Sequence, residues 1–486
     1  MNDRAISDRR FSENQPQLQE NNGKTDLTND SSDNKKNKNV VNRCKNNLNN
    51  SKCNNRSLSL DNEELEGQLI NNKMEIDDNS SLLNNKIKDV SVKEKLDNLV
   101  NGETFNNDIQ NIDHTNNEGQ EYLQVLYNWE TPTLICSAVN DFKPTDTNEN
   151  FTKGCYWSPD GTCILVPAEN FKLHVFELPR ELYSGNLPKN FHVSSFESSL
   201  KVKEGGLIYD SCWFPYMSSW DPSTCCFLST SQGSPIHLWD AFTGQLRATY
   251  RAYNQVDEVE AAISVRFTNF GKHIWSGFKN VLRTFDTNHP GRQIDSIYLK
   301  KDFPNITGLV SCIRENPGMT GLIAFGTYSK YIGLYKDGPL CSFQTSSGVT
   351  QIEFSPCGTK LYSSVRRGSE FLCWDLRNPG TVLYSLQNRQ SDTNQRIHFS
   401  LSYSGKEIIS GGTDGAVRIW QIPDNLQIDE ELNPHCNIQI STDCINGVDL
   451  HKNLPILSVC TGSRIYDNEE NKYRDNSVRL YWLGNS

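Results

Sequence analysis

The stretch Ser410–Trp420, SGGTDGAVRIW, constrains the fold of this chain more than any other. It places an Asp414-Gly415 step between two β-type runs. Such a step is the strongest short-range signal for a β-hairpin, because both central residues of the turn need a positive φ. The run after the turn alternates apolar and polar residues, as a half-buried strand does. The stretch therefore predicts two antiparallel strands joined by a tight turn.

Weaker copies of this unit recur through the last three quarters of the chain. Each copy contains three strand-like runs joined by turns, and the copies cover residues 151–178, 207–250, 261–287, 308–343, 348–386, 394–422 and 444–484. An aromatic residue ends the third strand of every copy: Phe176, Trp239, Phe285, Tyr335, Trp374, Trp420 and Trp482.

The spacing of these aromatic residues indicates the type of repeat. The spacings are 63, 46, 50, 39, 46 and 62 residues, and most lie near the roughly 40–45 residues of a WD-type propeller blade. Kelch repeats also run near 50 residues, but they lack the Trp-Asp step found at Trp239-Asp240 and Trp374-Asp375. Seven copies suit a closed ring, since propellers typically use about four to eight four-stranded blades. We therefore predict an all-β fold, a seven-bladed WD-type β-propeller over residues 125–486.

A separate strand can close this ring. The seventh copy has only three strand-like runs, and a three-stranded terminal blade would leave an exposed edge that favours aggregation. The run Thr133–Val139 precedes the first copy and has no hairpin partner nearby in the sequence. We expect this N-terminal strand to complete the seventh blade.

Residues 1–120 have a different composition from the rest of the chain. They hold 28 Asn and no Trp, whereas all nine Trp lie from Trp129 onward. Such a segment cannot bury enough apolar surface to offset the entropy lost on ordering. We predict a long, disordered, Asn-rich polar tail. Its basic run Lys35–Lys45 is typical either of a nuclear-import signal or of a solvated charge cluster.

Composition and motifs exclude several classes of function. The net charge of −11 excludes a globally basic nucleic-acid binder, so any nucleic-acid site must be a local patch. The fifteen Cys form no CxxC pair, which argues against a zinc site and against a secreted disulfide scaffold. There is no secretion signal and no apolar run approaching the roughly 18 residues of a membrane span. Catalytic and nucleotide-binding motifs are also absent. We expect a soluble, intracellular protein that is not an enzyme, with no metal, no cofactor, no small-molecule substrate and no membrane partner.

The Asp414-Gly415 turn favours a structural role. We expect Asp414 to hydrogen-bond backbone groups of its hairpin and of neighbouring segments. Ser410 and Trp420 on the flanking strands are likewise expected to belong to a structural network. A propeller without catalytic residues serves as a rigid platform whose binding residues lie on loops at the ring faces.

Several arginines fall close to predicted turns. Arginine beside aromatic residues suits unpaired RNA, because guanidinium groups bind phosphates while rings stack on bases. Arg366 and Arg367 stand in the turn where the sixth copy has Thr-Asp-Gly. The candidate RNA-binding residues are Arg247, Arg251, Tyr253, Arg366, Arg367, Arg377 and Arg396. For each single Arg the alternative is a solvated surface charge.

An acidic loop separates the second and third copies. Asp257, Glu258 and Glu260 lie within the run QVDEVEAA. These carboxylates would repel RNA and suit a basic protein partner. The alternative is a solvated loop.

Longer stretches carry a more specific signal than the general propeller pattern. Ile236–Arg292, with WDAFTG followed by LRATYRAYN and the acidic loop, resembles the telomerase Cajal body protein family of WD-repeat proteins. Further stretches similar to this family are Phe371–Arg377, Thr393–Leu401, Ser410–Trp420 and Asp443–Tyr466. The similarity covers roughly residues 125–484 and does not extend to the Asn-rich tail.

The resemblance implies a non-catalytic RNA-binding scaffold. The family binds the Cajal-body-box loop of small Cajal-body RNAs, and of telomerase RNA where it carries the box, and directs these ribonucleoproteins to Cajal bodies and telomeres. It implies a nuclear, Cajal-body location and partners such as dyskerin and other box H/ACA ribonucleoprotein proteins, telomerase and coilin. The alternative function is a protein–protein interaction propeller that acts as an assembly adaptor without binding RNA directly.

Overall fold

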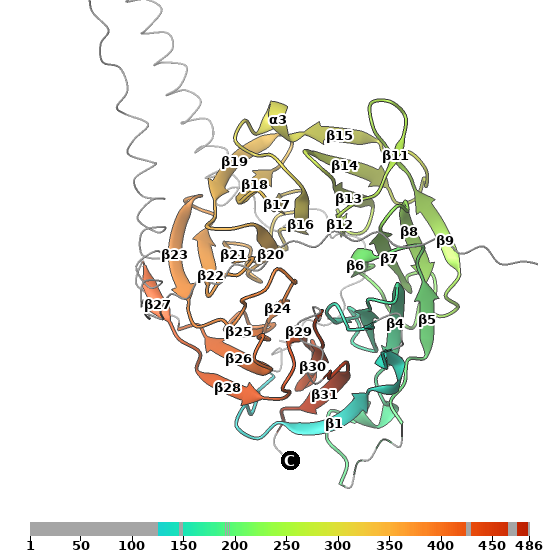
Figure 1. Cartoon of the computed structure of the whole chain (residues 1–486), viewed down its shortest axis with the longest axis vertical. Coiled ribbons are helices and arrows are strands. Elements are labelled where there is room, and N and C mark those ends of the chain that lie inside the picture. Colours follow the sequence, from blue (N-terminus) through green and yellow to red (C-terminus); the bar gives the residue numbers. More distant parts are fainter. Residues whose placement is uncertain are drawn as a thin grey trace, which may run out of the picture. The chain divides into compact units, whose positions relative to one another are not determined.

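The computed structural model of the chain describes residues 125–144, 149–189, 191, 193, 195–423, 429–464 and 474–484. The predicted tail, residues 1–120, lies outside these residues. The described part contains seven sheets of four or five strands arranged around a common axis (Figure 1). The sequence prediction of a seven-bladed β-propeller is therefore confirmed.

The blades follow the chain in order, and the first strand of each lies nearest the axis (Figure 1). Blade 1 contains β2 (Tyr156–Trp157), β3 (Cys163–Pro167), β4 (Lys172–Glu177) and β5 (Leu200–Lys203). Blade 2 contains β6 (Ile208–Trp213), β7 (Cys226–Ser231), β8 (Ile236–Asp240) and β9 (Leu246–Tyr250). Blade 3 contains β12 (Ser264–Thr268), β13 (His273–Gly277), β14 (Val281–Asp286) and β15 (Asp295–Tyr298). Blade 4 contains β16 (Val310–Glu315), β17 (Ile323–Thr327), β18 (Tyr331–Tyr335) and β19 (Pro339–Gln344).

The last three blades include two departures from simple chain order. Blade 5 contains β20 (Val349–Phe354), β21 (Lys360–Val365), β22 (Phe371–Asp375) and β23 (Thr381–Leu386). A fifth strand of this sheet, β27 (Glu430–Leu432), comes later in the chain, after the third strand of blade 6. Blade 6 contains β24 (Phe399–Leu401), β25 (Glu407–Ser410), β26 (Ala416–Gln421) and β28 (Cys436–Gln439). Blade 7 contains β29 (Ile445–Leu450), β30 (Ile456–Thr461), β31 (Val478–Trp482) and β1 (Thr133–Ala138).

Short elements join or decorate the blades. They are the hairpin strands β10 (Ala252–Tyr253) and β11 (Val259–Glu260), the 3₁₀ turns η2 (Asn140–Phe142) and η3 (Arg180–Ser184), and the single helical turn α3 (Leu299–Asp302). The parallel pairing of β27 with β23 covers the outer edge of blade 5. The sequence gives no clear signal for this added strand, because it depends on where the loop after blade 6's third strand lies in space.

The stretch Ser410–Trp420 forms the predicted antiparallel hairpin, but residues 411–415 join its strands in place of a tight turn, and only Gly415 of the Asp414-Gly415 step has a positive φ. Strands β25 and β26 pair antiparallel, with Ile409 opposite Ile419. Gly415 in the turn has φ +77°, a left-handed conformation that glycine adopts without steric cost. A side chain at this position would also collide with the Ser441 carbonyl, which lies 2.0 Å from an added Cβ.

The core is divided among the contacts between blades. Seven clusters of buried apolar side chains occur in the described residues, and each is shared by two neighbouring blades. The third-strand aromatics supply much of this core: Trp374 and Trp420, for example, are fully buried. Since burying such a side chain contributes about 1.5–3 kcal/mol, each blade depends on both of its neighbours.

The N-terminal strand closes the ring. β1 pairs antiparallel with β31, with Thr133 opposite Trp482 and Ala138 opposite Val478. Ile135 and Ala138 of β1 are buried in the cluster between blades 7 and 1. The predicted completion of the seventh blade by this segment is confirmed.

Deleting residues 129–140 from the full chain should give insoluble protein, because blade 7 loses its outer strand and exposes an edge. Solubility after expression and thermal unfolding check this. Soluble protein with one cooperative unfolding transition would contradict the role of β1 in closure.

Substitution of two neighbouring residues of β1, one buried and one exposed, distinguishes the contribution of side-chain packing from that of the strand itself. Ile135 is 8% exposed and Leu134 is 50% exposed. Ile135→Ala should destabilise the fold by about 2–4 kcal/mol, whereas Leu134→Ala should cost about 0.5 kcal/mol or less. Urea denaturation of both variants measures the difference.

Candidate nucleic-acid interface

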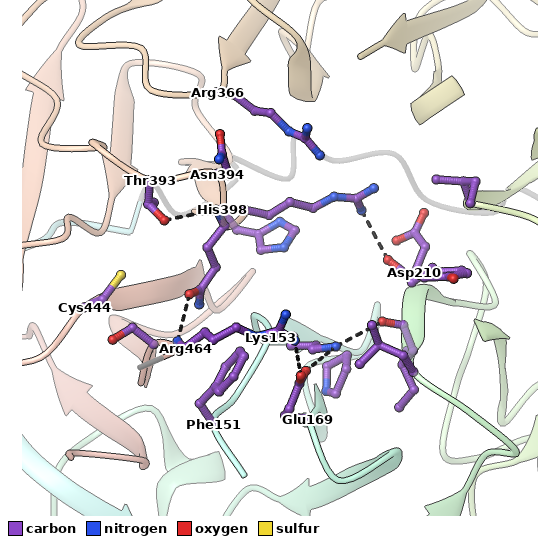
Figure 2. A pocket seen from close by; sticks show the side chains of 18 of the residues that line it. Phe151, Lys153, Glu169, Asp210, Arg366, Thr393, Asn394, His398, Cys444 and Arg464 are labelled. Carbon is purple, nitrogen blue, oxygen red and sulfur yellow. Dashed lines mark hydrogen bonds and ion pairs between the residues drawn. The ribbon is translucent and has the colours of Figure 1, made fainter. Parts of the chain in front are cut away.

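A cavity of about 650 Å³ opens at one end of the ring axis (Figure 2). We call it the upper cavity. Its walls come from the segments that lead into the innermost strands and from the loops between the second and third strands of the blades. Among its lining residues are Phe151, Lys153, Glu169, Tyr328, Arg366 and Arg464.

Two cations and one carboxylate form one side of the upper cavity. The Lys153 ammonium lies 2.7 Å from Glu169, which also binds Arg464. Burial lowers the pKa of Lys153, and Arg464 and Arg396 lower it further, while Glu169 opposes this effect. The Glu169 carboxylate therefore forms ion pairs with two basic groups, and the local positive charge is only partly neutralised.

Arg396 holds three blades together beside the same cavity. Before it enters blade 6, its guanidinium donates hydrogen bonds to the Tyr209 carbonyl of blade 2 at 3.3 Å and to the Ser311 carbonyl of blade 4 at 2.9 Å. It also donates to the Tyr328 hydroxyl at 3.0 Å. Burial disfavours its charge, but Tyr328 and Asp210 outweigh that effect and raise its pKa. Arg396 is thus anchored by the ring itself.

Arg366 has a different environment. It lies in the loop between β21 and β22, and its guanidinium carbon is 3.6 Å from the centre of the Tyr328 ring. Its Nε is buried and, within the described part of the chain, has no hydrogen-bond partner. In Figure 2 it lies across the cavity from Lys153 and Glu169. Arg366 is therefore positioned by stacking, and its guanidinium makes no hydrogen bond or ion pair to another described residue.

Arg367, the next residue, is exposed and does not line the cavity. Its φ of +50° lies in the left-handed region that usually favours glycine. Its backbone N–H bonds to the Thr393 carbonyl at 3.3 Å. The strained turn directs the two consecutive arginines into different surroundings, one at the cavity and one at the exposed surface.

The other predicted arginines do not converge on the upper cavity. Arg247 binds Asp240 at 2.8 Å, and Arg377 binds Asp375 at 3.0 Å. Arg251 is exposed beside the β10–β11 hairpin. Tyr253 lies in that hairpin, and Arg292 stacks on its ring at 4.6 Å.

The predicted acidic loop forms the β10–β11 hairpin, and its carboxylates already have partners. Asp257 binds Arg292 at 2.5 Å, and Glu260 binds Arg283 at 2.6 Å. Glu258 accepts a hydrogen bond from the Asn254 amide at 3.0 Å.

The three residues predicted to be structural lie within blade 6. The Asp414 carboxylate binds the Arg418 guanidinium at 2.5 Å and accepts a hydrogen bond from the Ala416 amide at 3.4 Å. Trp420 donates its indole N–H to the carbonyl of Gln387 at 2.9 Å, and Gln387 directly follows β23 of blade 5. Ser410 donates its hydroxyl hydrogen to the Gly411 carbonyl at 3.0 Å.

Among the residues of the upper cavity that the sequence did not single out are Lys153, Tyr328 and Arg464. Tyr328 occupies the loop between β17 and β18, which corresponds to the Arg366 loop one blade later. A comparison of this loop among all seven copies would have brought Tyr328 and Arg366 together. Lys153 and Arg464 have no comparable signal, because each is an isolated basic residue.

A second cavity, of about 500 Å³, lies at the opposite end of the strands. Its rim comes from the loops between first and second strands, and we call it the lower cavity. Arg314 in its wall binds Glu353 at 2.7 Å. Tyr156 and His398 line both cavities and are 3.1 Å apart between the Tyr156 hydroxyl and His398 Nε2. Burial, together with Arg396, Arg314 and Arg389, lowers the pKa of His398 to about 3, so this imidazole stays neutral.

Asp449 in the lower cavity accepts hydrogen bonds from the Trp157 amide and the Ser400 hydroxyl, both at 2.8 Å. Burial nevertheless raises the pKa of its carboxyl to about 6.

The described part of the chain contains no group of three or more His, Cys, Asp or Glu side chains arranged to hold a metal ion. None of the helices in this part has the length and apolar composition to cross a membrane.

The fold and its charged upper cavity define a WD-type β-propeller with a basic pocket on the ring axis, a class that typically uses its rigid ring for binding and not for catalysis. No family model matches the chain. Telomerase Cajal body protein 1 of Mus musculus is 40% identical over 357 residues, covering 72% of this chain and 66% of the mouse protein. The Homo sapiens protein of the same name is 41% identical over 343 residues, or 69% of this chain and 61% of the human protein. The chain belongs to the telomerase Cajal body protein family.

A relative with another name matches at lower identity. The guanine nucleotide-binding protein negative regulator 1 of Schizosaccharomyces pombe is 29% identical over 340 residues, or 66% of this chain and 82% of the yeast protein. The chain spans less than two thirds of the length of most of the telomerase Cajal body proteins it matches.

The raised pKa of Asp449 predicts a pH-dependent contribution to stability. Between about pH 4 and pH 6 the folded protein holds a proton on Asp449 that the unfolded chain has released, so this contribution falls as pH rises through about 6. Relative to wild type, Asp449→Asn should therefore gain on the order of 1–3 kcal/mol in free energy of unfolding between pH 4.5 and pH 7. Urea denaturation at both pH values measures this, with the exposed Asp337→Asn as control. A stability difference that is equal at both pH values would contradict it.

Proposed function

We propose that this protein is a non-catalytic RNA-binding scaffold that takes an RNA loop into the upper cavity. The observation that carries the proposal is Arg366, which lines the cavity and stacks on Tyr328, with a guanidinium that makes no hydrogen bond or ion pair within the described structure. An unpaired guanidinium donor at a cavity suits a phosphate, and the adjacent aromatic rings suit unstacked bases. RNA loops offer both groups together, because their bases are splayed out of the helix.

The local charge supports this assignment in an acidic chain. Four basic residues line the upper cavity (Lys153, Arg366, Arg396 and Arg464) against three carboxylates (Glu169, Asp210 and Asp392), so the lining carries 4 − 3 = +1. The whole chain carries −11. A compact site of this kind contacts few phosphates, and the affinity should therefore fall only modestly with salt.

Family membership supports the class of RNA. The chain's relatives are named for telomerase and the Cajal body. The ligand we propose is the Cajal-body-box loop of small Cajal-body RNAs, and of telomerase RNA where it carries the box. In this role the protein directs these ribonucleoproteins to nuclear Cajal bodies and to telomeres. Its proposed partners include dyskerin and other box H/ACA ribonucleoprotein proteins, telomerase and coilin.

The double substitution Arg366→Ala/Arg367→Ala should weaken binding of a Cajal-body-box RNA loop at least tenfold, since it removes the stacked donor and its exposed neighbour. Filter binding with the full chain measures the affinity, and circular dichroism confirms that the ring is folded. Unchanged RNA affinity in the folded double variant would contradict the assignment of the RNA site to Arg366 and Arg367.

Arg247→Ala and Arg377→Ala are matched controls for that experiment. Both side chains are already bound to aspartates, and neither lines the upper cavity. We expect each control to change RNA affinity less than threefold. A larger effect of either control would place the RNA elsewhere on the propeller.

A second candidate function is a protein-interaction adaptor that does not bind RNA. The β10–β11 hairpin favours it through Glu258, which is exposed and has no ion-pair partner in the described structure, whereas Asp257 and Glu260 are paired with Arg292 and Arg283. The name of the yeast relative also refers to the regulation of another protein. Ultraviolet crosslinking in cells separates the two functions: a shared loop motif in the crosslinked RNA supports the scaffold, and failure to recover RNA supports the adaptor.

A further inference from the structure

The most exposed large apolar side chain in the described structure is Trp220. It is 97% exposed and lies in the loop Phe214–Cys225 between β6 and β7, at the end of the ring that carries the lower cavity. Nearby chain segments expose further rings. Tyr216 of the same loop and Phe270 of the next blade are 55% and 56% exposed, and their ring centres are 6.1 Å apart. Grouped exposed aromatics of this kind mark interaction sites.

Hydrogen bonds hold the residues next to Trp220 in place. Ser219 donates its amide and its hydroxyl to the Asp160 carboxylate of blade 1, at 2.8 and 2.7 Å. Asp221 accepts bonds from the Ser223 amide and hydroxyl at 3.0 and 2.7 Å. The indole therefore projects from a loop that is already ordered.

Arg247 fixes the far end of the same loop. Its guanidinium donates to the Ser223 and Pro222 carbonyls at 2.6 and 2.7 Å and to Asp240 at 2.8 Å. This arginine, a candidate for RNA contact on sequence grounds, is occupied in positioning the loop. A preordered aromatic side chain loses little conformational entropy on binding, which is typical of an interface hot spot.

The groups that contact this loop are predominantly acidic. Asp160 accepts bonds from Ser219 of the loop, and Asp221 lies in the loop itself. Arg247 is the one guanidinium that bonds to the loop in the described structure, and it is paired with Asp240. Burial alone would raise the pKa of Asp160, but hydrogen bonds from Ser158 and Ser219 outweigh it and lower the pKa. The pKa of Asp240 is also lowered, by bonds from Thr243 and Arg247 against the effect of burial. Asp160 and Asp240 are thus negative at neutral pH.

We propose that the Phe214–Cys225 loop is a docking site for a basic peptide segment of a protein partner, with Trp220 as its anchor. A lysine or arginine side chain would lie on the indole face, where cation–π attraction acts. The surrounding aspartates would favour the same cation. This chemistry does not suit RNA, whose phosphates the aspartates repel. The site is separate from the upper cavity and does not depend on RNA binding there.

The test measures binding of the full chain to a fluorescein-labelled octapeptide of alternating Arg and Gly by fluorescence anisotropy at low salt. We expect saturable binding, with no binding of the Gln-Gly and Glu-Gly octapeptides. Trp220→Ala should raise the dissociation constant at least tenfold, and Asp221→Asn should raise it by a smaller factor. Tyr298→Ala is the matched control, because Tyr298 is a 40% exposed aromatic residue on outer strand β15, and it should leave the affinity unchanged.

Three results would overturn the proposal. The first is failure of the Arg-Gly peptide to bind, or equal binding by folded Trp220→Ala protein. The second is loss of RNA affinity in Trp220→Ala comparable to that of Arg366→Ala/Arg367→Ala, which would make the loop part of an RNA surface. The third is a wild-type dimer in sedimentation that Trp220→Ala converts to monomer, which would make the occupant a second copy of the chain. If Trp220→Ala loses peptide affinity and keeps its RNA affinity, the peptide site is supported whether or not the upper cavity is the RNA site.

Discussion

The pairing of β1 with β31 is the constraint on which the rest of the structure depends. Every blade buries one face against each neighbour, and the apolar cluster between blades 7 and 1 forms only when the first and last blades meet. The antiparallel register from Thr133–Trp482 to Ala138–Val478 brings segments more than 300 residues apart into one sheet. Because the loop-closure cost grows only slowly with length, the buried surface at this junction can offset it.

Closure also determines the geometry of the upper cavity. Arg396 enters from blade 6, yet it donates to carbonyls of blades 2 and 4. These oxygens are within reach only because the ring sets the distance across its axis. The same framework positions Lys153 from blade 1 opposite Arg366 from blade 5. The cavity is therefore a property of the assembled ring, and no single repeat contains it.

The fold could be predicted from sequence because its signals are local and repeated. The Asp414-Gly415 turn, the third-strand aromatics and the unpaired run before the first copy each follow from short-range pattern. The arrangement of site residues could be predicted only in part, because the availability of an arginine depends on tertiary contacts. Arg247 and Arg366 both lie near turns in the sequence, but one is bound by Asp240 and two carbonyls while the other is stacked on a ring from the preceding blade. Strand β27 was missed for a similar reason, since its partner β23 lies far from it in sequence.

The two ends of the ring differ in the use of the same residue types. At the upper cavity, guanidinium and ammonium groups outnumber carboxylates, and an aromatic ring stacks beneath an arginine whose Nε has no partner in the described structure. At the β6–β7 loop, carboxylates outnumber the one guanidinium, and the aromatic ring itself is exposed. A phosphate-bearing ligand and a cation-bearing ligand would thus be directed to opposite ends of the strands. Because the ring between them is rigid and packed, both could be held at once at a fixed separation, which is the geometry that a scaffold joining an RNA to a protein requires.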